Sequence, residues 1–200
     1  MTDEPNLNVD ADDYGRVGYG QIARYSPAIL AVVMVVAIGF IAFSSRDKET
    51  NTRDIIGQPA PDMTLTSFDG TTTTTLDSLT GNVVVLNFWA SWCEPCKTEM
   101  PAFEAIHQDA GADVRIVGVD IKNDRIENAT QLLTDTGVTY QIVRDSGGTH
   151  PVYGPIEAAF GLGDSYPVTV FVRPDGVVDK VTVGAMDEGQ IQDAIDDARD

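Results

Sequence analysis

Cysteine, histidine and basic side chains are all scarce in this sequence. Its 200 residues include two cysteines and two histidines, and 13 lysines and arginines stand against 31 aspartates and glutamates. Structural zinc takes four ligands, and His107 and His150 lie too far apart to complete a zinc-finger spacing with the cysteines. A zinc-binding module is therefore excluded, and no metal site is predicted.

The shortage of positive charge gives the chain a formal net charge of -18. Such a surface repels a phosphate backbone, so no nucleic-acid partner is expected. The acidity could serve general solubility or a surface for a cationic partner. Because the acidic residues are scattered without an acidic block, we favour solubility. With 42% hydrophobic residues and two tryptophans, the chain is expected to fold around a buried core.

Charge is missing altogether from residues 25–45, which read YSPAILAVVMVVAIGFIAFSS. As a helix this segment would span ~31 Å at ~1.5 Å per residue, about the thickness of the hydrocarbon core of a bilayer. A buried core helix is disfavoured because the run is apolar on every face. A cleavable signal peptide is disfavoured because a long acidic segment precedes it. We therefore predict an uncleaved transmembrane anchor helix at residues 25–45.

The predicted anchor separates a short tail from a larger domain. Residues 1–24 are polar without apolar periodicity and are predicted to be a disordered tail. Residues 46–56 are predicted to be a linker and residues 57–200 the folded domain. Basic residues flank the anchor on both sides, so charge alone leaves its orientation open.

Strand and helix patterns alternate through the first part of this domain. Residues 62–75 predict a β-hairpin, and the continuous apolar run VVVLNFW at 83–89 predicts a strand buried on both faces. A helix from 94 to about 107 and a strand at 114–120 follow. The next helix is predicted to be capped by Asp124 and Glu127, to bury Ile126, Ala129, Leu132 and Leu133, and to end at Gly137, before a strand near 140–143.

The end of the chain has a different order. The segment VTVFVRPDGVVDKVTVG predicts two antiparallel strands joined by a tight turn, and residues 187–198 predict an amphipathic helix. A βαβ unit, a further helix and strand, a hairpin and a last helix describe a mixed sheet flanked by helices. The sequence therefore predicts an α/β domain with the thioredoxin fold and an N-terminal β-hairpin extension.

Both cysteines lie in the segment NFWASWCEPCKTEMP, residues 87–101, where the strand at 83–89 gives way to a helix. A purely structural disulfide between them would close a short loop and stabilise the fold by only ~2 kcal/mol. As a second alternative, the two thiolates alone could hold copper(I). At a helix start, unpaired backbone N–H groups and the helix dipole favour a thiolate. Cys93 is therefore predicted to attack a disulfide, and Cys96 to resolve the mixed disulfide that results.

This segment resembles the active site of membrane-anchored thioredoxin-like proteins of the TlpA/ResA type, which include the thiol-disulfide oxidoreductases of cytochrome c maturation. The resemblance covers roughly residues 57–200 and rests on the motif WCEPC with an apolar strand before it and Glu99 and Pro101 after it. It implies that Cys93 is the nucleophile, that Cys96 is the resolving thiol, and that Glu99 tunes proton transfer.

The resemblance also implies a substrate-binding surface around the cysteines. Trp92, Glu94 and Pro95 would contribute to it from the motif, and Tyr166 and Pro167 from the opposite side. A cis bond before Pro167 would expose backbone groups of Tyr166 for strand-like pairing with a client peptide. The family usually has a small or aliphatic residue where Tyr166 stands, so the preferred substrate is left open.

By the same resemblance the protein is expected in the cell membrane, single-pass, with a cytoplasmic N-terminus and an extracytoplasmic domain. It implies reduction of protein disulfides, with apocytochrome c as a candidate client, through a Cys93–Cys96 dithiol/disulfide cycle without any other cofactor. In an oxidising compartment the pair needs electrons from a transmembrane thiol carrier.

Two alternative functions stay open. One is a copper-binding or copper-delivery module that uses both thiolates as ligands. The other is a thiol peroxidase, which would need a threonine where Ala90 stands.

Overall fold

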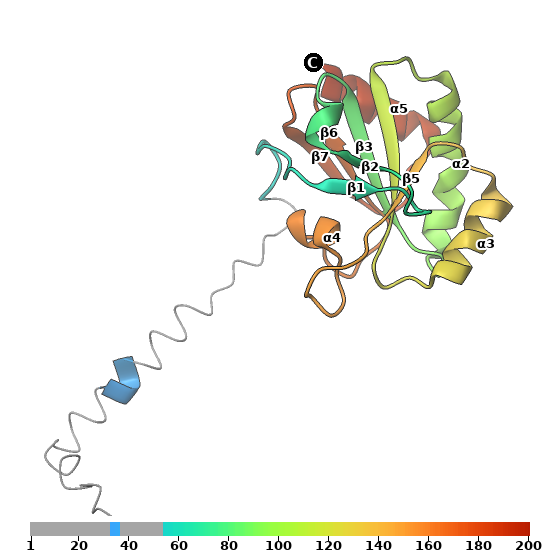
Figure 1. Cartoon of the computed structure of the whole chain (residues 1–200). Coiled ribbons are helices and arrows are strands. Elements are labelled where there is room, and N and C mark those ends of the chain that lie inside the picture. Colours follow the sequence, from blue (N-terminus) through green and yellow to red (C-terminus); the bar gives the residue numbers. More distant parts are fainter. Residues whose placement is uncertain (1–32, 37–53) are drawn as a thin grey trace, which may run out of the picture. The chain divides into compact units, whose positions relative to one another are not determined.

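The computed structural model describes residues 33–36 and 54–200, and residues 33–36 are helical (Figure 1). Most of the predicted tail, anchor and linker therefore lies outside the described residues. Within the part of the chain that is described, no helix combines the length and the hydropathy needed to cross a membrane. The domain discussed below comprises residues 54–200.

A five-stranded mixed sheet forms the centre of this domain, with the strand order β5-β4-β3-β6-β7 (Figure 1). Strands β3 (Val83–Trp89), β4 (Val114–Asp120) and β5 (Gln141–Arg144) are parallel, whereas β6 (Val168–Val172) and β7 (Val178–Val183) are antiparallel to their neighbours. All residues of β3 are buried, as expected for a central strand with layers on both faces. The predicted bounds of β3 and β4 are confirmed.

Helices α2 (Glu94–Asp109) and α5 (Glu188–Arg199) cover one face of the sheet. One apolar cluster fills the space between these helices and the sheet. It contains Phe103 and Ile106 of α2, Ile191 and Ile195 of α5, and Val85 of β3. These helical residues have the spacing that the sequence predicted for core-facing positions. Helix α3 (Ile126–Thr136) lies beside α2 (Figure 1).

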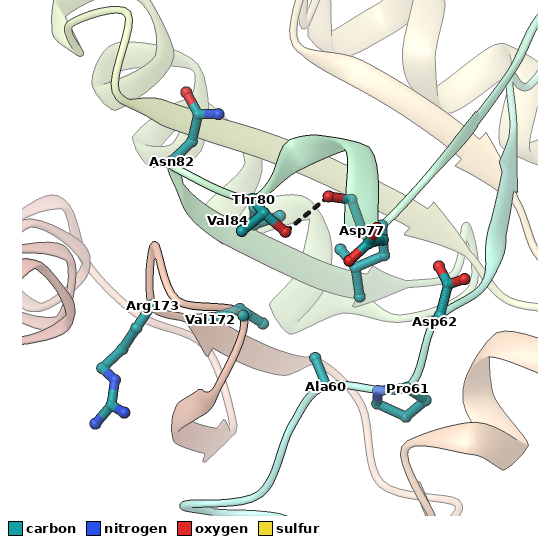
Figure 2. Close-up of a pocket in the computed structure, with 11 residues that line it drawn as sticks. Ala60, Pro61, Asp62, Asp77, Thr80, Asn82, Val84, Val172 and Arg173 are labelled. Carbon is teal, nitrogen blue, oxygen red and sulfur yellow. Dashed lines mark hydrogen bonds between the residues drawn. The ribbon is translucent and has the colours of Figure 1, made fainter.

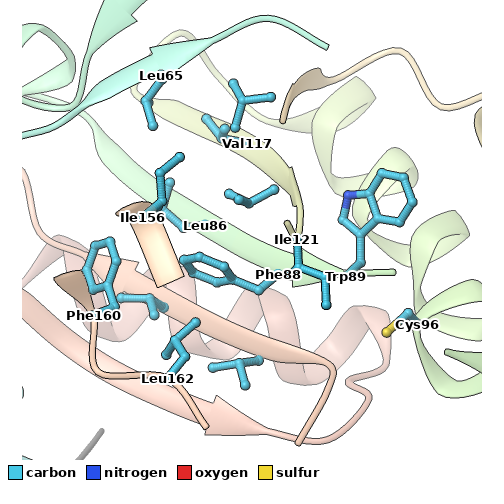
Figure 3. Close-up of a cluster of buried hydrophobic side chains, with 14 of the residues drawn as sticks. Leu65, Leu86, Phe88, Trp89, Cys96, Val117, Ile121, Ile156, Phe160 and Leu162 are labelled. Atoms are coloured by element: carbon cyan, nitrogen blue, oxygen red, sulfur yellow. The ribbon is translucent and has the colours of Figure 1, made fainter. Parts of the chain in front are cut away.

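The other face of the sheet is covered by the short helix α4 (Pro155–Ala159) and by an N-terminal hairpin, β1 (Thr64–Thr66) and β2 (Thr73–Thr75), which precedes the 3-10 turn η2 (Asp77–Leu79). Figure 3 shows Leu65 from this hairpin and Phe160 after α4 in the same cluster as Leu86 and Phe88 of β3. The predicted thioredoxin fold with a hairpin extension is therefore confirmed.

The start of α3 differs from the prediction. Its N-cap is Arg125, without a side-chain cap, and Ile126, expected in the core, is 45% exposed. Asp124 precedes this N-cap, and its carboxylate accepts hydrogen bonds from Ser91 in the loop after β3 and from the backbone N–H of Arg125, not from the N–H groups of the helix. Gly137 ends α3 in the left-handed conformation at φ 65°, as predicted.

Candidate active site

The two cysteines lie at the junction of β3 and α2 and are joined by a disulfide. Cys93 is the N-cap of α2, and its Sγ accepts a hydrogen bond from the backbone N–H of Cys96 at 3.2 Å. Pro95 stands in the first helical turn, where its missing N–H leaves no unmet hydrogen bond. One N–H group of this turn, that of Cys96, therefore points at the sulfur that was predicted to be the nucleophile.

The two sulfurs differ in their access to solvent. Cys93 is 4% exposed and Cys96 is fully buried in the core beneath α2. Cys93 keeps some exposure and Cys96 has none, so Cys93 is the one placed for attack on another molecule. The arrangement agrees with the predicted order of roles.

The motif residues beside Cys93 form an exposed rim. Trp92 is 53% exposed, and Glu94 and Pro95 face solvent. The Glu94 carboxylate pairs with the Lys97 ammonium at 2.6 Å, one turn along α2. This neighbouring cation offsets the negative charge that Glu94 places beside Cys93.

The structure brings Tyr166 and Pro167 to this rim from the loop before β6. The peptide bond between them is cis, as predicted. The ring of Tyr166 meets the ring of Trp92 edge-on, with 6.0 Å between the ring centroids. The Tyr166 hydroxyl donates to the Glu157 carboxylate at 2.5 Å, which fixes the ring against the buried start of α4.

Glu99 lies one turn after Cys96 on the buried side of α2, with 2% of its surface exposed. One carboxylate oxygen accepts from the side-chain amide of Asn87 at 2.7 Å, and the other accepts from the backbone N–H of Met186 at 3.2 Å. Burial raises the pKa of Glu99 to about 7, although both hydrogen bonds oppose the rise. This carboxyl can therefore exchange a proton near neutral pH.

A second buried carboxylate cluster supports the loop that carries Cys93. Asp124 accepts hydrogen bonds from both the backbone N–H and the hydroxyl of Ser91. Asp120, at the end of β4, pairs with the Arg144 guanidinium. Burial raises the pKa of Asp120 to about 8, the nearby Asp124 carboxylate adds to the rise, and Arg144 opposes it. The sequence prediction missed these roles because they depend on contacts between loops.

Glu157 is a further residue that the sequence did not indicate. It is fully buried and accepts from the backbone N–H groups of Lys122 at 3.0 Å and Gly154 at 2.9 Å, besides the Tyr166 hydroxyl. Glu157 thus ties three loops together next to the cis-proline. His150 accepts from two backbone N–H groups of its own loop, so it is a loop residue, as expected from the sequence.

A small separate pocket of about 40 Å³ lies at the opposite end of β3. Figure 2 shows Asn82 and Val84 at the start of that strand, with Ala60 and Pro61 of the N-terminal extension across the hollow. Strand β3 separates this pocket from the cysteines by ~20 Å at ~3.3 Å per residue. A group bound there could not react with the disulfide.

Across residues 33–36 and 54–200, no three His, Cys, Asp or Glu side chains come together as ligands for a metal ion. The copper alternative therefore gains no third ligand from the described residues.

Comparison with known proteins gives a consistent assignment. The AhpC/TSA family matches residues 56–181. Thiol-disulfide oxidoreductase ResA of Oceanobacillus iheyensis is 30% identical over 175 residues, which are 84% of this chain and 85% of that protein. Thioredoxin-like protein YneN of Bacillus subtilis is 28% identical over 178 residues, which are 88% of this chain and 98% of that protein.

Among solved structures, MTB dsbF in its mixed oxidized and reduced forms superposes with a TM-score of 0.60. It is 25% identical, and the match covers 68% of this chain and 95% of that one. The predicted resemblance is confirmed. The chain therefore belongs to the AhpC/TSA family, among the thiol-disulfide oxidoreductases of the ResA and DsbE type.

Proposed function

We propose that this chain is a membrane-anchored, extracytoplasmic protein-disulfide reductase, with disulfides of the apocytochrome c type among its clients. The observation that carries the proposal is Cys93, which is the N-cap of α2, keeps 4% exposure and is bonded to the fully buried Cys96. The relatives named ResA support the reaction class, and the uncharged segment at 25–45 supports the anchor.

In the reduced protein, the Cys93 thiolate attacks one sulfur of the client disulfide. A bond forms between Cys93 and that sulfur, and the second client sulfur leaves as a thiolate that takes up a proton. Cys96 then loses its proton and attacks the Cys93 sulfur, which releases the first client sulfur as a thiol. Two electrons and two protons pass to the client, and Cys93–Cys96 ends as the disulfide.

Glu99 is the group we assign to the proton of Cys96. It follows Cys96 by three residues, which places both side chains on the same face of α2, and both are buried. Its pKa of about 7 suits a group that accepts a proton in one half of the cycle and returns it in the other. A transmembrane thiol carrier would restore the dithiol by the reverse exchange.

Trapping tests the reaction and the clients together. In a Cys96→Ala variant of the full-length chain, the mixed disulfide at Cys93 cannot be resolved, so client proteins should accumulate as covalent adducts that a thiol reductant releases. A Cys93→Ala variant is the matched control and should trap none. Equal adduct formation in both variants would count against the assigned roles, and adducts without any c-type apocytochrome would remove that client class.

Labelling tests the location. A membrane-impermeant maleimide added to intact cells should modify Cys93 of a Cys96→Ala variant, because the domain is proposed to face the outside of the membrane. Modification only after the cells are lysed would place the domain in the cytoplasm instead.

A further inference from the structure

A groove of about 240 Å³ is lined in part by Trp92, the residue that precedes the reactive cysteine. Its lining includes Trp92 and Tyr166, whose rings meet edge-on, and Val152 and Tyr153 of the loop before α4. We call this the aromatic groove; it is lined by Trp92, Ile121, Asn123, Val152, Tyr153, Glu157, Asp164 and Tyr166. A client whose disulfide reaches Cys93 must lie across or next to it.

The walls of the aromatic groove are held in place by polar contacts. The Tyr153 hydroxyl donates to Asp164 at 2.5 Å, and the His150 ring stacks on the Tyr153 ring with 4.8 Å between centroids. The Lys122 ammonium donates to the carbonyls of Gly147 and His150, which fastens the loop that carries Tyr153. The groove is therefore formed before a client arrives.

The groove carries negative charge that its own residues do not neutralise. The Lys122 ammonium donates its hydrogen bonds to loop carbonyls. Among the described residues, no cation pairs with the Glu157 carboxylate or the Asp164 carboxylate. Glu157 is buried and saturated with donors, whereas Asp164 is exposed, and only one of its oxygens has a hydrogen-bond partner among the described residues. Asp164 can therefore receive a donor from a client.

Aromatic faces together with an accessible carboxylate favour a cationic side chain. The rings of Trp92, Tyr153 and Tyr166 can each attract a cation through the ring face, and Asp164 can pair with it at the rim. An acidic client side chain would meet Asp164 and the buried Glu157 charge at short range. The net charge of -18 also draws cationic clients toward the molecule.

We propose that the aromatic groove is a specificity site for a lysine or arginine side chain that flanks the reactive cysteine of the client. The proposal rests on the reductase function proposed above and adds its client preference. The proposal also revises our interpretation that the acidic residues serve only general solubility. One of them, Asp164, is placed where it can pair with a cationic side chain of the client.

Peptide reduction tests this preference. We would reduce the full-length chain in non-ionic detergent and mix it with disulfide-bonded peptides that differ only in the residue next to a cysteine, lysine or glutamine. Counting the enzyme's remaining thiols over time, after removal of the peptide, gives the second-order rate constant for the single reduction of each peptide. The wild-type chain should reduce the lysine peptide roughly fivefold faster than the glutamine peptide, within the ~2- to 30-fold range that cation–aromatic contacts provide.

Two variants locate the preference. Asp164→Asn should lower the lysine-to-glutamine ratio to about twofold, the lower end of the range for cation–aromatic contacts, because the exposed carboxylate is lost while the rings stay. Asp193→Asn, which removes one charge from an exposed position of α5, is the matched control and should keep the wild-type ratio.

The possible results separate this inference from the proposed function. Reduction of both peptides at the same rate would overturn the specificity site and leave the reductase in place. A ratio that survives Asp164→Asn would overturn the role of Asp164. If the reduced chain reacts with neither peptide nor with the small neutral disulfide of 2-mercaptoethanol, the reductase function itself fails.

Discussion

Glu99 shows how much the surroundings of one residue decide its chemistry. A carboxylate on a helix is ordinarily solvated, but Glu99 is 2% exposed and receives one hydrogen bond from a side-chain amide and one from the backbone. These bonds do not fully replace hydration, so the charged form is disfavoured and the pKa of Glu99 rises to about 7.

The raised pKa of Glu99 predicts a pH-dependent stability. The folded state keeps the Glu99 proton between its ordinary pKa of 4.5 and about 7, so folded protein binds more protons than unfolded protein in that window. The free energy of unfolding should fall by ~3 kcal/mol from this residue as pH rises from 5 to 8. Urea unfolding of the oxidised protein at both pH values should show that Glu99→Gln lacks this part of the fall.

An unchanged pH dependence in Glu99→Gln would contradict the assignment. In the Glu99→Gln variant with both cysteines intact, Cys96 should also resolve the mixed disulfide at Cys93 more slowly at pH 7. The expected decrease is about 10²-fold or more, since a positioned acid–base group contributes that much. Glu188→Gln, which changes an exposed carboxylate in the first turn of α5, serves as the control for both measurements.

Local sequence was sufficient to place the two cysteines in the fold. The spacing of Cys93 and Cys96 after an apolar strand predicts a redox pair at a helix start, and both sulfurs lie there. It was not sufficient for Ser91, Asp124 and Glu157, because hydrogen bonds between residues 33 to 35 positions apart leave no periodic signal. Asp124 was therefore mistaken for a helix cap.

The two loops that follow β3 and β4 behave as one element. Asp124 of the second loop satisfies the backbone N–H and the hydroxyl of Ser91 in the first, two residues before Cys93. Both loops lie at the carboxyl ends of parallel strands, which register Trp89 against Asp120. The position of the nucleophile therefore depends on a contact across this edge of the sheet.

Removal of this contact should loosen the active-site loop. Asp124→Ala leaves two buried donors of Ser91 unpaired and should lower the free energy of unfolding by ~2–4 kcal/mol. Ser91→Ala removes only the hydroxyl bond and should cost ~1 kcal/mol. Urea unfolding measures both costs. Equal costs for the two variants would show that the backbone bond contributes nothing.

Helix α4 is the element that sequence periodicity did not predict. It has five residues, too few to show a period of 3.6, and Asp145 holds its start by accepting from the backbone N–H groups of Ile156 at 3.0 Å and Glu157 at 2.8 Å. Strands β3 and β4 were predicted with their full bounds because both are long runs in which nearly every residue is buried.

The packing behind α4 should be essential to the fold. Phe160 is fully buried, and its ring meets that of Phe88 edge-on with 5.8 Å between centroids. Phe160→Ala should lower the free energy of unfolding by ~3–5 kcal/mol through lost burial and the cavity left behind. Phe68→Ala, at a half-buried position on the same cluster, should cost less. A Phe160→Ala loss below about 1 kcal/mol would contradict this packing.

At the scale of the whole molecule, three buried carboxyls have pKa values shifted in the same direction. Burial raises the pKa of Glu99 to about 7, of Asp145 to about 6 and of Asp120 to about 8. Opposite cases such as Asp175, whose pKa is lowered by its hydrogen bond from Arg173, lie at the surface. Such surface carboxylates contribute to the free energy of unfolding at neutral pH, and this contribution is lost only as pH falls below the ordinary pKa range of aspartate.

The domain should therefore be most stable in mild acid. Each raised carboxyl binds its proton more tightly when folded, so the free energy of unfolding falls as pH rises from about 5 to 8, by more than the ~3 kcal/mol expected from Glu99 alone. Repulsion within a chain of net charge -18 has the same sign, but 0.5 M salt screens surface charges and leaves buried groups little affected. Urea unfolding of the oxidised protein at pH 5 and pH 8 in 0.5 M salt should retain most of the difference. A difference that salt abolishes would assign the effect to surface charge, and stability that rises with pH would exclude the buried carboxyls as its source.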